Sequence, residues 1–148
     1  MAVPKKLTTL LEKSRIPFEI IPHRVVFTAY DAAQTLKVKL SEIAKTLLVK
    51  IDRGYALVIL SADQNLDIKK LSKLTGAKKI SFPKEKDVMA FIKSTKAPIS
   101  SFGSLYDVPV ILEKKFSKVK SAYFSAGTFT DSVRMKLTDF MVLEQPAV

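Results

Sequence analysis

The sequence predicts an α+β fold with a mixed or mainly antiparallel sheet. Two observations predict it: apolar, β-rich runs are joined as a hairpin, and helical stretches lie between strands without the regular alternation of a doubly wound sheet. The chain has 148 residues, of which 47% are hydrophobic and 26% charged, as in ordinary globular proteins. No repeat, linker or low-complexity tract divides it. We therefore expect one compact domain over residues 1–148.

The N-terminal quarter is predicted to hold two helices around a short strand. Leu7, Leu10 and Leu11 recur at helical spacing and predict a surface helix over residues 4–14. A short strand over 18–21 ends at Pro22. Thr28, followed three residues later by Asp31, predicts a helix over 28–36 with Thr28 as its N-cap.

The middle of the chain begins with a small helix over 41–44 and is then rich in β-branched residues. The runs 46–51 and 55–60 are separated by Asp52-Arg53-Gly54, which is typical of a hairpin turn. Asp67 is the expected N-cap of a helix over 68–74 that Gly76 closes. The remaining expected strands are 79–82, 108–112, 122–125 and 132–135, and the remaining helices are 88–92 and 138–143.

The charge of the chain is strongly basic. Twenty-five Lys and Arg residues against 14 Asp and Glu residues give a formal charge of +11. Such a surplus is the electrostatic footprint of a protein that binds a polyanion, and dispersed lysines attract phosphates without reading sequence. The alternative is a basic, well-solvated surface with no such partner, and charge alone does not decide between them.

Several classes of site are excluded by composition. The chain has no Cys and a single His, so disulfides, thiolate nucleophiles, Cys-based metal sites and paired-imidazole metal sites cannot form. A Ser–His–Asp triad could use only His23. Nucleotide-binding glycine motifs and a ligand-spaced carboxylate cluster are also absent, so we expect no cofactor and no metal. No apolar run approaches the roughly 18–20 residues of a membrane span, and the N-terminus lacks a signal-peptide core, so we expect a cytoplasmic protein with no membrane partner.

Two loops carry small hydroxyl residues and glycine. One covers residues 97–103 and the other residues 125–132. Such loops can present N–H groups and hydroxyls to a ligand, or can be ordinary turns stabilised by their own hydrogen bonds.

The order of several segments carries more information than any one of them. Lys45-Thr46-Leu47-Leu48-Val49 is followed by Leu66-Asp67-Ile68-Lys69-Lys70-Leu71, and then by Ile99-Ser100-Ser101-Phe102-Gly103 and Ser125-Ala126-Gly127. Together with His23, Thr28-Ala29 and Val133-Arg134-Met135-Lys136, this order resembles the YbaK/prolyl-tRNA-synthetase-associated family of editing domains. The resemblance extends from about residue 5 to residue 143.

The resemblance implies a curved, barrel-like mixed sheet with flanking helices and the activity of a trans-editing hydrolase. Members of the family hydrolyse the ester that joins a wrong amino acid to the 3′ end of tRNA, commonly tRNA(Pro). It therefore implies aminoacyl-tRNA deacylation by a positioned water, with Ala, Ser or Cys as the group removed. The implied partners are the acceptor 3′ end of tRNA and prolyl-tRNA synthetase. The alternative is a non-catalytic tRNA- or synthetase-binding module of the same fold.

The resemblance also implies site residues. Lys45 is the expected catalytic residue, with its ammonium on the terminal adenosine phosphate or the aminoacyl group; the alternative is a lysine at a helix C-terminus, worth about 0.3–1 kcal/mol. The family's Gly-x-x-x-Pro loop reads Ala97 to Ser101 here, and we expect this change to favour small aminoacyl groups. For Thr28 we favour the N-cap over substrate contact, and we expect His23 at the pocket wall or the surface. The expected substrate-binding residues are Thr28, Ala97, Pro98, Ile99, Ser100, Ser101, Gly103, Ser125, Gly127, Thr130 and Ser132.

Overall fold

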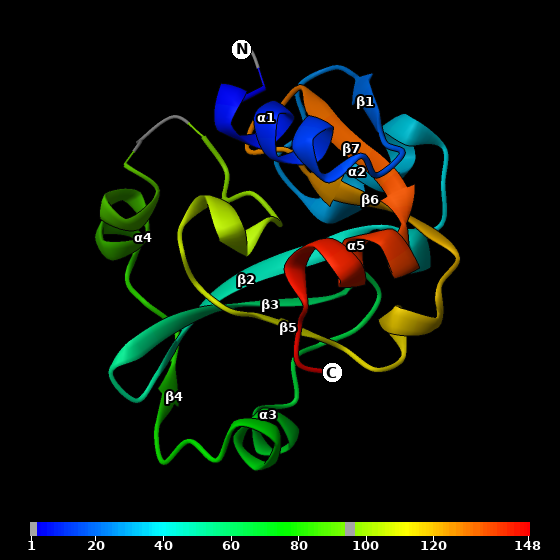
Figure 1. Cartoon of the computed structure of the whole chain (residues 1–148). Helices are drawn as coiled ribbons and strands as arrows, with labels where there is room; N and C mark the ends of the chain where they lie inside the picture. Colours follow the sequence, from blue (N-terminus) through cyan, green and yellow to red (C-terminus); the bar gives the residue numbers. More distant parts are fainter. Residues whose placement is uncertain (1–2, 94–96) are drawn as a thin grey trace.

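Two β-sheets organise the computed structural model, which describes residues 3–93 and 97–148 (Figure 1). The first is antiparallel, in the order β1 (Glu19–Pro22), β7 (Asp131–Lys136), β6 (Ser121–Ser125). The second has the order β4 (Ile80–Ser81), β2 (Ala44–Ile51), β3 (Gly54–Ser61), β5 (Val110–Leu112), with β3 and β5 parallel. The α+β class expected from the sequence is confirmed.

The barrel-like sheet implied by the resemblance is wrong in one respect, because the strands do not close into a barrel. The two sheets approach each other where β2 begins, and in the described part of the chain a single bridge joins them there, between Ile43 and Tyr123. The strands β1 and β4 end their sheets and do not pair with each other. A barrel needs a continuous hydrogen-bonded circuit, and this chain has two sheets that meet at one corner.

The helices lie around these sheets, and their ends follow local sequence signals. Thr28 Oγ1 accepts a hydrogen bond from Asp31 N at 3.0 Å, and Asp67 Oδ1 accepts one from Lys70 N at 3.1 Å, so both predicted N-caps are confirmed. The α-helices are α1 (Lys5–Ser14), α2 (Ala29–Leu36), α3 (Ile68–Thr75), α4 (Glu85–Ile92) and α5 (Leu137–Glu144). The 3₁₀ turns are η1 (Leu40–Glu42), η2 (Gly103–Leu105) and η3 (Phe116–Lys118).

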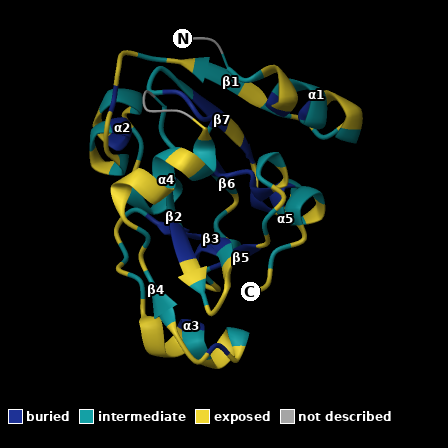
Figure 2. Cartoon of the chain, turned by 90° about the vertical axis from the view of Figure 1, so that its left-hand side faces the viewer, coloured by how far each residue is buried: buried dark blue, intermediate teal, exposed yellow. Residues whose placement is uncertain are grey.

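The main core lies between the two sheets, and α1 and α5 also pack on it. Four phenylalanines are at most 1% exposed in it, and the rings of Phe124 and Phe140 stack with centroids 4.3 Å apart. Because side chains alternate along a strand, Ala44 and Leu48 of β2 face this core, whereas Val49 faces a second cluster under α3. Buried residues along β2, β3 and β7 are dark blue in Figure 2. The alternation decides which β2 residues can reach each side of the sheet.

Candidate active site

A small hollow of about 110 Å³ lies between the N-terminus of α2, the start of β2 and the loop that joins β6 to β7. The segment after β1 forms one wall, since His23 N donates to Thr130 O at 2.8 Å and Val26 N donates to Phe129 O at 2.9 Å. The polar lining residues are His23, Thr28, Tyr123, Ser125, Thr128, Asp131 and Ser132. The apolar lining residues are Val26, Phe27, Ala29, Ala32, Ile43, Ala44, Pro98, Phe124 and Phe129.

The loop over residues 97–103 is fastened to the end of β6 by serine hydroxyls. Ser100 and Ser101 are fully buried. Ser101 Oγ accepts from Ser125 N at 2.8 Å and shares a 2.8 Å hydrogen bond with Thr46 Oγ1 of β2. Ser100 Oγ donates to Ser125 O at 2.9 Å, and Ser125 Oγ donates to Ile99 O at 2.7 Å. These hydroxyls therefore hold the loop in place mainly through contacts with β6 and β2, which are distant in the sequence, rather than through local turn hydrogen bonds.

A half-buried tyrosine supports the same loop from the other side. Ser100 N donates to Tyr106 Oη at 2.8 Å. Burial raises the pKa of Tyr106, so its phenol stays neutral, and the loop backbone is held by a neutral hydrogen-bond partner. The position of Pro98 at the hollow thus depends on several contacts made behind it.

The turn from β6 to β7 presents a carboxylate to the hollow. Asp131 Oδ2 accepts from Thr128 Oγ1 at 2.9 Å and from Thr130 Oγ1 at 3.0 Å. Among the described residues, Oδ1 of Asp131 has no protein donor within hydrogen-bonding distance. Gly127 takes a φ of 89°, which an L side chain rarely adopts, and so permits the turn. The result is a fixed negative charge at the edge of a small pocket.

An aromatic pair stands at the mouth of the hollow. The rings of Phe27 and Phe129 are tilted with centroids 5.0 Å apart, and Phe27 is 72% exposed. An exposed phenylalanine of this kind offers a face on which a planar group can stack.

Lys45 does not line the hollow. As the second residue of β2 it points to the face opposite Ala44, and its Nζ donates to Gln64 O in the loop before α3. Gly103 is also away from the hollow: a Cβ there would lie 2.6 Å from Val108 O, so close packing against the segment before β5 explains this glycine.

The structure therefore divides the residues expected from the sequence. Thr28, Pro98, Ser125 and Ser132 line the hollow. Ser100, Ser101, Ile99, Gly127 and Thr130 support its loops, and Ala97 begins the described part of the first loop.

Sequence reasoning placed His23 at the pocket wall or the surface, and His23 lines the hollow. It missed other lining residues with chemistry to offer, among them Phe27, Phe129 and Asp131. The available signals were the single His after the Pro22 that ends β1, and a carboxylate within a run of hydroxyl residues.

A second, larger groove has a volume of about 730 Å³ and lies on the face of β3 that packs toward α3. It is lined by Leu60, Leu71 and Ile111, with Lys70, Lys114 and Lys118 among its charged residues. None of the site residues expected from the sequence lines it. We take the smaller hollow as the candidate active site, because hydroxyls, a carboxylate, an imidazole and an exposed aromatic ring converge there.

Within residues 3–93 and 97–148, no three or more His, Asp or Glu side chains are grouped so as to hold a metal ion. Within the same residues, no helix is both long and apolar enough to cross a bilayer.

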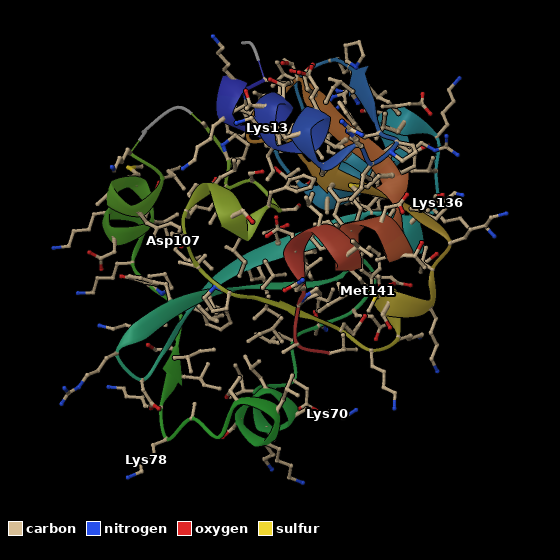
Figure 3. All side chains as sticks on the ribbon, viewed as in Figure 1. Lys13, Lys70, Lys78, Asp107, Lys136 and Met141 are labelled. Carbon is tan, nitrogen blue, oxygen red and sulfur yellow. The ribbon has the colours of Figure 1, made fainter. Side chains whose placement is uncertain are left out.

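Exposed lysine side chains of this basic molecule are available to bind an external partner. Figure 3 shows Lys70, Lys78 and Lys136 pointing away from the body of the molecule. In the described part of the chain, the ion pairs are Arg24–Asp31 and Arg134–Glu19, so no lysine is neutralised by one.

Comparison with known proteins gives the class. Residues 23–143 match the family model of the aminoacyl-tRNA editing domain, and the chain belongs to that family. The deacylase class expected from the sequence is thereby confirmed.

Individual relatives agree with this class. The chain is 30% identical over 110 residues to the prolyl-tRNA editing protein ProX of Acetoanaerobium sticklandii, covering 73% of this chain and 67% of ProX. It is 26% identical over 151 residues to the multifunctional Ser/Thr-tRNA deacylase ProXp-y of Escherichia coli K12, covering 96% of this chain and 88% of that one. The fold is also similar to a solved structure described as a candidate trans-editing enzyme for prolyl-tRNA synthetase, with a TM-score of 0.79, 18% identity, and 97% and 92% of the two chains covered.

Proposed function

We propose that this protein is a trans-editing deacylase that removes a small non-cognate amino acid, such as Ala, Ser or Cys, from the 3′ end of tRNA(Pro). The observation that carries the proposal is the small hollow with Asp131 at its edge, in a chain of the aminoacyl-tRNA editing family. A volume of about 110 Å³ suits a short side chain better than a branched one. We further propose that residues 1–148 form one editing domain, since α1, which precedes the matched region, buries Leu7 and Leu11 in the main core.

Each part of such a substrate has a partner of matching chemistry. The α-ammonium of the aminoacyl group pairs with Oδ1 of Asp131, since a charge-assisted hydrogen bond is the strongest polar contact available there. The terminal adenine stacks on Phe27, whose ring is exposed at the mouth. The ester lies near Pro98, which lines the hollow.

Ester hydrolysis here needs no covalent nucleophile. It needs a positioned water and donors aimed at the developing oxyanion, each of which is worth roughly 10²–10³ in rate. The hydroxyls of Ser100, Ser101 and Ser125 are engaged with backbone and side-chain partners, so their contribution is to hold the walls at fixed positions. That engagement also favours the second candidate function, a non-catalytic tRNA-binding module of the same fold.

Lys45 keeps a proposed role at the tRNA rather than in the hollow. We propose that its ammonium leaves Gln64 O and contacts a phosphate of the incoming 3′ strand, because the neighbouring Ala44 lines the hollow. Lys45→Ala is expected to lower kcat/KM at least tenfold, or about 1.4 kcal/mol, whereas Lys50→Ala, an exposed lysine on the same strand, should change it less than twofold. Equal effects of the two substitutions would remove any specific role for Lys45.

The deciding experiment measures release of labelled amino acid from tRNA(Pro) charged with Ala, Ser, Cys or Pro. We expect Ala and Ser esters to be cleaved and the Pro ester to be spared. Asp131→Asn should lower kcat/KM for the Ala ester at least tenfold, because the amide cannot neutralise an ammonium. Tight tRNA binding without any deacylation would support the binding module instead. Since the proposed substrate is made by prolyl-tRNA synthetase, we propose that enzyme as a partner and the cytoplasm as the location. Co-purification of the synthetase with this protein tests the partnership.

A further inference from the structure

The one histidine of the chain is hydrogen-bonded to a serine inside the hollow. His23 Nε2 lies 3.0 Å from Ser132 Oγ, although the two residues are 109 positions apart in the sequence. The other ring nitrogen, Nδ1, lies 2.7 Å from Arg24 O. Both His23 and Ser132 line the hollow, and Ser132 is only 8% exposed.

The partners of the imidazole determine its tautomer. A backbone carbonyl can only accept a hydrogen bond, so Nδ1 must carry the proton. In the neutral ring Nε2 is then the acceptor, and Ser132 Oγ–H donates to it. The arrangement is that of a hydroxyl bonded to a base whose ring is oriented from behind by a third group, here a carbonyl oxygen.

The charged and titratable side chains near His23 have partners other than its imidazole ring. Asp131, next to Ser132 on β7, holds two threonine hydroxyls, and Arg24 is paired with Asp31 of α2 at 3.2 Å. Tyr123 of β6 also lines the hollow, and Arg134 of β7 is paired with Glu19 of β1. Within the described residues, no side-chain hydrogen bond of these groups involves a ring nitrogen of His23.

We propose that His23 and Ser132 form the proton relay that activates the attacking water, an inference that rests on the proposed deacylase function. Water gives a proton to Ser132 Oγ while Ser132 gives its own proton to His23 Nε2, and the water oxygen forms a bond to the ester carbonyl carbon. The carbonyl carbon–ribose oxygen bond then breaks. The ribose oxygen takes the proton back through the same relay, leaving a free amino acid and a tRNA with its 3′ hydroxyl restored.

Composition supports this assignment independently of the geometry. Imidazole is the side chain whose charge changes between about pH 5 and 8, and this chain has one. General acid–base groups typically contribute 10²–10⁴ in rate, and a base must lie within hydrogen-bond reach of the proton it takes. Ser132 is within that reach and stands on the wall of the hollow.

The test compares single-turnover deacylation of Ala-tRNA(Pro) by the wild type, His23→Gln, His23→Ala and Ser132→Ala between pH 5 and 8. Glutamine keeps a hydrogen-bonding side chain but cannot take a proton. We expect His23→Gln and Ser132→Ala to be at least 100-fold slower than the wild type at pH 7.5. The ratio of wild-type to His23→Gln rates should rise with pH and then level off, and titration of the substrate's own amino group cancels in this ratio.

Added imidazole separates chemistry from structure. The rate of His23→Ala should increase with the concentration of neutral imidazole, which a merely structural role would not produce. Gln34→Ala, an exposed change on α2, serves as the control for imidazole effects elsewhere, and thermal unfolding checks each fold. A His23→Gln rate within threefold of the wild type, or a rate ratio that stays flat with pH, overturns the relay while the editing function stands. A wild type inactive on every ester overturns the proposed function and the relay with it.

Discussion

Ser101→Ala distinguishes a hydroxyl that supports the candidate active site from one that takes part in chemistry. Ser101 is fully buried, and its Oγ accepts from Ser125 N at 2.8 Å and pairs with Thr46 Oγ1 at 2.8 Å. Removing it leaves the partly buried N–H of Ser125 without this partner, which costs about 1–3 kcal/mol. For a chain of this size, 1 kcal/mol lowers the melting temperature by about 2–4 °C, so we expect a decrease of about 2–12 °C.

The assay pairs urea unfolding with deacylation of Ala-tRNA(Pro). Ser117→Ala removes a hydroxyl that bonds to Lys114 O in an exposed turn, and this control should change the unfolding free energy by less than about 0.5 kcal/mol. In Ser101→Ala the lost stability should accompany a moderate fall in rate, because the loop behind Pro98 is less firmly held. If stability were unchanged while activity disappeared, the structural interpretation of this hydroxyl would be refuted.

Four further predictions concern the charge, the metal requirement, the altered loop and one half-buried carboxylate. Affinity for tRNA, measured against salt, should fall with a log–log slope of roughly −0.7 to −0.9 per phosphate contact, and a salt-insensitive affinity would make the +11 charge irrelevant to binding. EDTA should leave deacylation intact; loss of activity that zinc restores would contradict the positioned-water proposal. Ala97→Gly should widen the range of esters hydrolysed on the tRNA panel without abolishing hydrolysis, and an unchanged profile would contradict a role for this loop in selecting the substrate. Burial raises the pKa of Glu144, so the folded state holds its proton more tightly than the unfolded state, and its contribution to stability is present at low pH and lost as the pH rises through the raised pKa. In Glu144→Gln that part of the pH dependence of urea unfolding should vanish.

Much of this protein was determined by sequence signals that act over a few residues. Thr28 and Asp67 cap their helices because a side-chain oxygen can bond an N–H three residues later whatever the rest of the fold does. The β2–β3 hairpin forms around its turn. The order of the segments along the chain was enough to indicate the family. The α+β class followed from the same local patterns.

The candidate active site was decided by tertiary structure, because its contacts join residues far apart in the chain. Alternation along β2 places Lys45 on the face opposite Ala44, so a residue chosen from its position in a motif lies outside the hollow. The serine hydroxyls of each loop bond to backbone groups of the other loop, and the composition of either loop alone does not reveal these contacts. The pairing of β1 with β7 brings His23 to Ser132 across 109 residues. Periodicity and capping are properties of neighbouring residues, whereas strand pairing depends on how the whole chain buries its apolar surface, and that packing places the imidazole beside the hydroxyl.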